Sequence, residues 1–215
     1  MFFDSRHHAA TLLAESLHVY RAQHPLVLAI PRGALPMGKI IADKLGGELD
    51  VVLTRKLRAP GNPEYAIGAI DETSWATISE YASAAGATPA YIEQEKQTQL
   101  ELIERRRQQY TPIRKPADPY DRIVIVVDDG LATGATMIAA LHALRARKPK
   151  ALICAVPVAH PDTLDKVAQY ADKIICLHSP HGFYAVGQFY REFPQVEDRE
   201  VIEILQIASK NQPLP

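Results

Sequence analysis

The sequence of 215 residues lacks several features that would indicate a specialised class of protein. It has only two cysteines, Cys154 and Cys176, which lie in apolar runs without the spacing of metal ligands and so favour buried thiols in a reducing compartment. The net charge is −1, so the basic excess typical of nucleic-acid-binding proteins is missing. No apolar run approaches the ~20 residues that cross a membrane, and residues 1–8 lack the order of a signal peptide. We therefore expect a cytoplasmic protein with neither membrane nor nucleic acid as a partner.

Strand and helix patterns alternate along the chain, without an internal repeat. Five short, continuous apolar runs are typical of strands that are buried on both faces of a parallel sheet. They are residues 26–30, 49–54, 123–127, 151–158 and 173–177. Segments of helical periodicity separate them, and strands joined by helices imply parallel pairing through right-handed crossovers. We predict an α/β fold over residues 1–215: an open, mainly parallel five-stranded sheet with helices on both faces, plus a small hood.

The segment between the second and third apolar runs departs from this alternation. Residues 55–64 combine three positive charges with two prolines and a glycine, a composition typical of loops. We predict a mobile loop there and a small hairpin after it, together spanning residues 55–80. A long polar helix is expected over residues 88–109. Its charge run at residues 104–107 is interpreted as a solvated face.

The most informative segment follows the strand at residues 123–127. Two adjacent acids, Asp128 and Asp129, stand at the carboxyl end of that strand, where open α/β sheets bind ligands. Small residues that let the backbone approach an anion, hydroxyl donors and a helix N-terminus come next. These residues are Gly130, Ala132, Thr133, Gly134, Ala135 and Thr136. The segment offers a phosphate cradle beside two acceptors suited to a diol, which a phosphorylated sugar would satisfy together.

Other interpretations of this segment fit less well. A Walker A loop ends in Gly-Lys-Ser/Thr, which is missing here, and the spacing of Gly130 and Gly134 does not match the dinucleotide-binding G-x-G-x-x-G. A helix with an ordinary N-cap needs one acid rather than two, and needs neither two threonines nor the run of small residues. The eight histidines show no ligand spacing, so we predict no metal site built from side chains.

The run at residues 126–136 closely resembles the phosphoribosyl pyrophosphate (PRPP) motif of type I phosphoribosyltransferases. That motif joins apolar strand residues, two acids, a small-residue turn and Thr-Gly-x-Thr. The resemblance extends over nearly the whole chain and is closest to a bacterial branch of predicted phosphoribosyltransferases of unsettled substrate. The segments that carry this closer likeness are residues 31–38, 55–57, 59–64, 66–69 and 183–190.

The resemblance implies roles for the matching residues of the PRPP motif and of the loop after the first strand. Asp128 and Asp129 would hold the ribose 2′ and 3′ hydroxyls, and residues 132–136 would hold the 5′-phosphate. Arg32 and Gly33 correspond to the pyrophosphate loop, in which a strained, often cis, peptide aims backbone N–H groups. We expect that peptide between Arg32 and Gly33.

Two further regions acquire expected roles in the same way. Arg55 and Lys56 correspond to basic residues at the start of a mobile loop that covers the departing diphosphate, although a solvated basic turn is the alternative. Residues 178–195 correspond to the hood that selects the acceptor. Phe183 and Tyr184 could stack on a planar base or pack the hood against the core, whereas Phe189 and Tyr190 are expected in the core.

The activity that the resemblance implies is Mg²⁺-dependent transfer of a 5-phosphoribosyl group from PRPP to a nitrogenous acceptor, with release of pyrophosphate. The expected acceptor is a small molecule, in the first place a nucleobase. Mg²⁺ would be held mainly through PRPP oxygens and water, and a homodimer is one option for the assembly. Two alternatives stay open: a regulatory protein that binds PRPP or a nucleotide without turnover, and a phosphoribosyl hydrolase that uses water as the acceptor.

Overall fold

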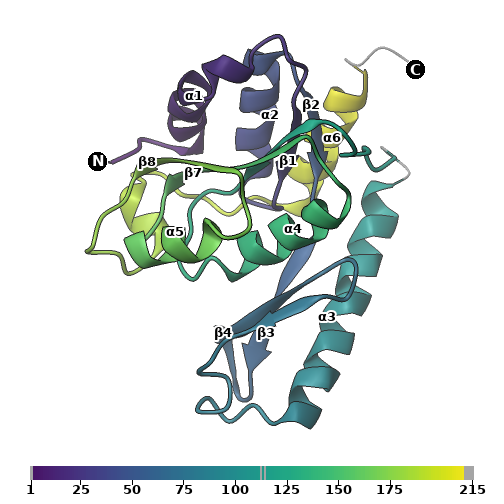
Figure 1. Ribbon diagram of the computed structural model, residues 1–215, viewed down its shortest axis with the longest axis vertical. Coiled ribbons are helices and arrows are strands. Elements are labelled where there is room, and N and C mark those ends of the chain that lie inside the picture. The colour runs from purple at the N-terminus through teal and green to yellow at the C-terminus, as the bar shows by residue number, and fades with distance from the viewer. Residues whose placement is uncertain (1, 112, 114, 211–215) are drawn as a thin grey trace.

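The computed structural model describes residues 2–111, 113 and 115–210, and an open sheet of five parallel strands lies at its centre (Figure 1). The strands are β1 (Leu26–Ala29), β2 (Glu48–Val51), β6 (Ile123–Val127), β7 (Ala151–Val158) and β8 (Lys173–His178). Their order is β2-β1-β6-β7-β8, and every neighbouring pair is parallel. The predicted five-stranded sheet is confirmed. Because the chain builds the sheet outward in both directions from β1 and β6, the carboxyl ends of these two strands form the switch point at which such sheets bind ligands.

Helices cover both faces of this sheet (Figure 1). They are α1 (Arg6–Ser16), α2 (Leu35–Leu45) and α6 (Asp198–Lys210) on one face, and α4 (Ala135–Ala146) and α5 (Pro161–Val167) on the other. Successive strand residues point to opposite faces, so Val27 and Ile125 pack in the core under α1 and α2, whereas Leu28 and Val126 pack against α4. Among the described residues, none of the helices is both long and apolar enough to span a membrane.

Residues 54–110 form a lobe of antiparallel sheet and one long helix. Its elements are β3 (Thr54–Ala59), β4 (Asn62–Asp71), β5 (Ala76–Ile78) and α3 (Pro89–Tyr110). The sheet order is β3-β4-β5, and α3 packs along β3 and β4 (Figure 1). The lobe also contacts the parallel domain, since α4 packs against β3 and β4. The predicted long helix and the predicted hairpin, which is β4 and β5, are confirmed.

The predicted loop at residues 55–64 is wrong, because this segment forms β3, a tight turn and the start of β4. Pro60 and Gly61 make the turn, and Gly61 adopts a left-handed backbone with φ of 69°. Pro63 falls where the pairing of β4 with β3 shifts register. A bulge of this kind tolerates a residue that has no N–H to donate. The two prolines are therefore compatible with a hairpin, because one lies in its turn and the other at its bulge.

The apolar run at residues 49–54, predicted as one strand, contains the end of one strand and the start of another. β2 ends at Val51, and Thr54 begins β3 in the other sheet. The connecting residues Val52 and Leu53 stay buried, so the hydrophobic pattern continues across the break and conceals it. The chain thus passes from the parallel sheet to the lobe without a solvent-exposed linker.

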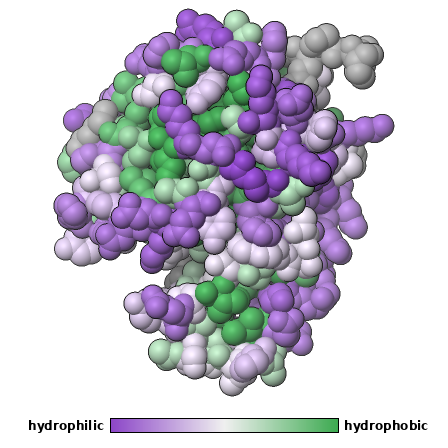
Figure 2. All heavy atoms as spheres, in the orientation of Figure 1, coloured by the Kyte–Doolittle hydropathy of each residue, from purple (hydrophilic) through white to green (hydrophobic). Residues whose placement is uncertain are grey.

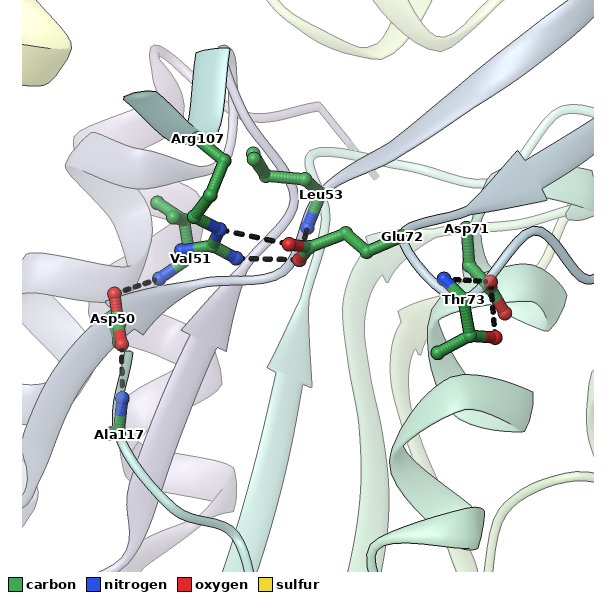
Figure 3. A network of polar contacts seen from close by, with 8 residues as sticks. All are labelled: Asp50, Val51, Leu53, Asp71, Glu72, Thr73, Arg107 and Ala117. Atoms are coloured by element: carbon green, nitrogen blue, oxygen red, sulfur yellow. Dashed lines mark hydrogen bonds and ion pairs between the residues drawn. The ribbon is translucent and has the colours of Figure 1, made fainter. Parts of the chain in front are cut away.

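A polar network fixes this passage between sheet and lobe (Figure 3). Glu72, in the β4–β5 turn, accepts a hydrogen bond from the Leu53 N–H at 3.2 Å and from Arg107 Nε of α3 at 2.8 Å. Asp50 at the end of β2 is 3% exposed, and its Oδ2 accepts from the Ala117 N–H at 2.7 Å. Because a buried carboxylate is costly without such donors, the network holds both chain crossings of the lobe in one arrangement.

Candidate functional site

A cleft of about 620 Å³ opens at the carboxyl ends of β1 and β6. One wall belongs to the parallel domain and consists of the loop after β1 and the segment between β6 and α4. The other wall belongs to the lobe and is formed by β3, β4 and α3. The cleft therefore lies where the strand order predicts a ligand, and both parts of the molecule contribute to it.

The acids predicted to hold a diol, Asp128 and Asp129, lie on the wall of the parallel domain. The Asp129 N–H donates to Oδ1 of Asp128 at 2.8 Å. Oδ2 of Asp129 faces the guanidinium of Arg6 in α1, with 2.9 Å to Nε and 2.8 Å to Nη2. The two carboxylates thus differ: Asp129 is paired with a cation, and Asp128 is held by a backbone N–H.

Burial is the largest influence on the ionisation of both acids. It raises the pKa of Asp128 well above the usual range, and the negative charge of Asp129 raises it further. Burial also raises the pKa of Asp129, although the charge of Arg6 acts in the opposite direction. Lys56, across the cleft, lowers the pKa of both acids through its positive charge. Two acids in this environment cost stability, which hydroxyl donors from a ligand would offset.

The loop between β6 and α4 has the form of an anion cradle. Gly134 caps α4 with a left-handed backbone, and a Cβ atom there would lie 2.8 Å from Cγ2 of Thr163. Oγ1 of Thr163 donates to the carbonyl of Ala132 at 2.7 Å, and Oγ1 of Thr133 accepts from the Ala135 N–H at 3.4 Å. These bonds fix the loop shape at the N-terminus of a 12-residue helix, where unpaired N–H groups and the helix dipole attract phosphate.

The loop after β1 meets the acids closely. A Cβ atom on Gly33 would lie 2.2 Å from Oδ2 of Asp129, so the residue at this position must be a glycine unless the carboxylate moves. Gly33 and Pro31 line the cleft. The side chain of Arg32 extends toward α6 instead, where Nη1 is 3.5 Å from a carboxylate oxygen of Asp198. Arg32 therefore faces Asp198 of α6, and the pyrophosphate role of this loop stays a prediction.

One detail of the prediction for this loop is wrong. The cis peptide bond joins Pro31 and Arg32, one bond before the expected position between Arg32 and Gly33. The expected position came from the match of Arg32 and Gly33 to the pyrophosphate loop of the family. Nothing in the residue types distinguishes that bond from its neighbour.

The lobe provides a basic wall, which we define as Arg55, Lys56 and Arg58 of β3 and Arg106 of α3. Nε of Arg55 donates to Oε1 of Gln99 at 2.7 Å. Burial lowers the pKa of Arg55, and the positive charges of Arg106 and Arg58 lower it further. Within the described ranges, Lys56, Arg58 and Arg106 make no ion pair with a carboxylate. Like charges gathered in this way favour binding of an anion with several negative charges.

Reasoning from the sequence missed two residues, Arg106 in the cleft wall and Arg6, which contacts Asp129. Arg106 belongs to the charge run at residues 104–107, for which a solvated face was predicted. Glu104 and Arg105 are indeed exposed, but Arg106 lines the cleft and Arg107 pairs with Glu72. Arg6 carried a weak signal, because a cation in the first turn of a helix opposes the helix dipole. No sequence pattern linked either residue to the acids.

The predicted hood at residues 178–195 contains a short 3₁₀ helix, Val186–Phe189, and no strand beyond the end of β8 among its described residues. Val186 reaches the cleft. Phe189 and Tyr190 are 5% and 7% exposed, so their expected place in the core is confirmed. The rings of Phe183 and Phe189 have centroids 5.1 Å apart, and Tyr184 is 93% exposed. Phe183 thus packs within the hood, while Tyr184 stays available to a ligand.

Comparison with known families then decides the classification. The model of the family described as "Phosphoribosyl transferase domain" matches residues 3–192. The chain belongs to this family. The match covers both walls of the cleft and most of the predicted hood, so the family suggested by the PRPP motif is confirmed.

Individual relatives agree with the family. The protein named "Putative phosphoribosyl transferase Rv0571c" from Mycobacterium tuberculosis strain H37Rv is 36% identical over 210 residues, which are 97% of this chain and 47% of that protein. This phosphoribosyl transferase domain thus spans about half the length of the curated relatives it matches. The crystal structure of TT1426 from Thermus thermophilus superimposes with a TM-score of 0.80 at 40% identity, covering 96% of this chain and 99% of that one.

A more distant structure shares the fold alone. A hypothetical protein from Neisseria gonorrhoeae, crystallised with bound ppGpp, has a TM-score of 0.50 at 12% identity. The alignment covers 97% of this chain and 98% of that one. The combination of parallel sheet and lobe is therefore found in chains whose sequences have diverged widely.

Proposed function

We propose that this phosphoribosyl transferase domain transfers the 5-phosphoribosyl group of PRPP to a nitrogenous acceptor and releases pyrophosphate. The observation that carries the proposal is the division of the cleft into an acidic wall with an anion cradle and a facing wall of basic side chains. PRPP has a matching group for each: a diol, a 5′-phosphate and a diphosphate. No simpler phosphorylated sugar would use both walls.

Each residue then acts by binding or by charge. Asp128 and Asp129 accept hydrogen bonds from the ribose 2′ and 3′ hydroxyls, and the loop of residues 132–136 binds the 5′-phosphate. As the bond between the anomeric carbon and the diphosphate oxygen breaks, its electron pair leaves with the diphosphate. Lys56 and Arg106 meet that growing negative charge, together with backbone N–H groups of the loop after β1. Catalysis of this kind rests on positioning and electrostatic stabilisation.

Mg²⁺ is part of the same proposal. The cleft contains hydroxyl oxygens at Thr133 and Thr136, a kind of donor that suits a hard cation. Among the described residues, no three or more His, Cys, Asp or Glu side chains gather closely enough to hold a metal ion. The ion would therefore be held mainly by oxygens of PRPP and by water, and it would supply further neutralisation of the diphosphate.

The acceptor is proposed to be a nucleobase or a similar flat amine. What supports this class is the position of the hood, where Val186 lines the cleft and Tyr184 is exposed. An exposed tyrosine can stack on a planar ring with little loss of side-chain entropy. The homodimer and the cytoplasmic location expected from the sequence stay predictions.

Release of pyrophosphate from PRPP tests the proposal directly. The purified chain is incubated with PRPP and Mg²⁺, first alone and then with each member of a panel of nucleobases and amines. Release that requires one acceptor is the expected result. Release without any acceptor would indicate the hydrolase, and calorimetric binding without release would indicate the regulatory protein. Neither binding nor release under any condition would contradict the proposed function.

A further inference from the structure

We propose that Arg6 is a positioning residue, which holds the Asp129 carboxylate in the orientation and charge state that a ribose hydroxyl requires. This inference rests on the proposed function, since the ribose is the ligand in question. Arg6 lies 123 residues before Asp129 and belongs to α1, which packs against the far side of the parallel sheet from α4. It would act on the ligand only through Asp129.

The contact between the two side chains is asymmetric. Nε and Nη2 of Arg6 lie 2.9 and 2.8 Å from the same oxygen of Asp129, Oδ2. Within the part of the chain that the structure describes, no side-chain donor is bonded to Oδ1. Both side chains are largely buried, at 11% exposure for Arg6 and 16% for Asp129. The guanidinium thus fixes one oxygen and leaves the other to accept a hydroxyl.

Contacts with Phe193 and Pro194 hold the Arg6 side chain in place. Its guanidinium carbon lies 3.7 Å from the centre of the Phe193 ring, and Nη1 donates to the Pro194 carbonyl at 2.6 Å. A stacked arginine with a bonded Nη1 has few alternative rotamers. The hydroxyl of Tyr190 donates to the Asp129 carbonyl at 2.7 Å. Arg6 and Tyr190 therefore connect Asp129 to the segment that follows the hood helix.

The loop after β1 lies against another side of the Asp129 carboxylate, at Gly33. A Cβ atom on Gly33 would lie 2.2 Å from Oδ2 of Asp129 and 3.2 Å from Nη2 of Arg6. Because Gly33 has no side chain, Oδ2 of Asp129 has room to lie against the backbone of this loop. With Arg6 on one side and the backbone of Gly33 on another, the orientation of Asp129 is set before a ligand arrives. Preorganisation of this kind saves the cost of ordering the side chain on binding.

The charge of Arg6 matters because the other groups around Asp129 act in different directions. Asp128 beside it is a second acid whose own pKa burial raises, Tyr190 is neutral, and Lys56 is positive but lies on the opposite wall. Burial raises the pKa of Asp129, and Arg6 is the largest opposing influence. Without Arg6, Asp129 would take up its proton at a higher pH. A protonated carboxyl group is a poorer acceptor for a hydroxyl than a carboxylate is.

Three variants separate these effects. Arg6→Gln removes the charge and the fork of donors, whereas Arg6→Lys keeps the charge and loses the fork. Arg191→Gln is the matched control, because Arg191 pairs with exposed Asp4 near the same helix and does not contact Asp129. Thermal unfolding confirms that each variant is folded. The side-chain carboxyl carbon of Asp129, assigned with Asp129→Asn, is then titrated by ¹³C NMR without ligand, and PRPP affinity is measured by calorimetry between about pH 6 and 8.5, a range chosen to span neutrality.

We expect Asp129 to titrate at a higher pH in Arg6→Gln than in the wild type. The PRPP affinity of Arg6→Gln should fall about tenfold or more at neutral pH, the loss of one charged hydrogen-bond partner, and the deficit should grow as the pH falls. Arg6→Lys should show lowered affinity with the pH dependence of the wild type. Arg191→Gln should match the wild type in both measurements.

Several results would overturn the inference. An unchanged titration of Asp129 in folded Arg6→Gln would remove the role in charge, and an affinity deficit that is equal at every pH would indicate a merely structural role. If Arg6→Gln does not fold, the PRPP affinity of Arg6→Lys tests the inference. Wild-type affinity in Arg6→Lys would show that the guanidinium donors do not position Asp129. If the wild type itself binds no PRPP, the proposed function fails, while the titration still decides whether Arg6 controls Asp129.

Discussion

The two walls of the cleft are carried by different parts of the fold. The acidic wall lies at the end of β6, which pairs with β1 on one side and β7 on the other and is buried from Val124 to Val127. The basic wall lies on β3 and α3, whose lobe meets the sheet through short crossings and a polar network (Figures 1 and 3). One wall lies at the end of a central strand of the sheet. The other lies on the lobe, although the buried lobe residues Leu57 and Ile67 belong to the same hydrophobic core as the sheet.

The outer surfaces of the parallel domain and of the lobe also differ. In Figure 2, hydrophobic atoms gather over the upper, sheet-bearing part of the molecule, and a smaller hydrophobic group marks the lobe below it. A rigid wall suits the sugar and its 5′-phosphate, which keep their place during transfer. A wall on a separate lobe suits a diphosphate that must be enclosed and then released. The comparison predicts that acidic-wall substitutions act on binding and basic-wall substitutions act on rate.

The largest effect is expected from the acidic wall. Asp128→Asn combined with Asp129→Asn should weaken PRPP binding by about 2–4 kcal/mol, because hydrogen bonds to charged acceptors are worth about 1.5–3 kcal/mol each. Calorimetry with PRPP and Mg²⁺ measures this loss. Asp162→Asn with Asp165→Asn is the control, since it removes two exposed acids of α5 outside the cleft. Affinity that is unchanged in the cleft variant would remove the ribose from the acid pair.

The second largest effect is expected from a substitution in the basic wall, which should lower the rate of transfer. Lys56→Ala should lower kcat roughly 100-fold or more, with a smaller change in PRPP affinity, because the diphosphate gains charge as the bond breaks. Steady-state and single-turnover kinetics separate the two quantities. Lys96→Ala on the outer part of α3 is the control, since Lys96 pairs with Glu93 there. If Lys56→Ala turns over like the wild type with every active acceptor, suspicion moves to Arg55, Arg58 or Arg106.

The difference between the walls also explains what the sequence could predict. The acidic wall and its cradle are one continuous segment, residues 128–136, so their residue types and order were enough to recognise them. Gly33 followed from the same resemblance. Arg55 and Lys56 were placed correctly at the cleft, but on a strand rather than a loop. The prolines were given too much weight, because a turn and a bulge accommodate them.

Arg6 and Arg106 could not be predicted for a physical reason. Arg106 lines the cleft and Arg6 contacts Asp129, each from a helix. Which way a helical residue points depends on the axis and rotation of its helix, and the sequence alone does not fix these. On α3, Arg105 is exposed while its neighbour Arg106 lines the cleft. Neighbouring residues of a charge run thus have different roles, and a sequence pattern without tertiary contacts cannot assign them.

A smaller effect is expected from the contacts of Glu72 that join the lobe to the sheet. Glu72→Gln removes the charge that Arg107 binds and weakens the acceptor for the Leu53 N–H. We expect a loss of about 1–2 kcal/mol in the free energy of unfolding, at the lower end because the pair is partly exposed, and faster amide exchange at Leu53. Glu93→Gln, which breaks the exposed pair with Lys96, should change neither. Unaltered exchange at Leu53 would mean that the network does not hold the lobe.

The smallest effect concerns stability rather than ligands, and it contrasts the walls most directly. Burial raises the pKa of Asp128 in the folded state, so the folded protein gains stability from protonation and loses that gain as the pH rises through the raised pKa. Asp128→Asn removes the charge that is costly at neutral and alkaline pH. We expect this variant to be more stable than the wild type by about 0.5–1 kcal/mol near pH 8, with the difference shrinking toward about pH 4, where the wild-type carboxyl is also neutral.

Urea unfolding at several pH values measures this difference, and Lys56→Met provides the contrast from the basic wall. Lys56 is exposed, so its substitution should change the free energy of unfolding by less than about 0.5 kcal/mol at any pH in that range. A gain in Asp128→Asn that does not vary with pH would show that its origin is packing rather than the buried charge. A gain of equal size in Lys56→Met would show that the two walls do not differ in their cost to the fold. The expected result instead places the energetic cost of the site in the acidic wall, where burial raises the pKa of both acids.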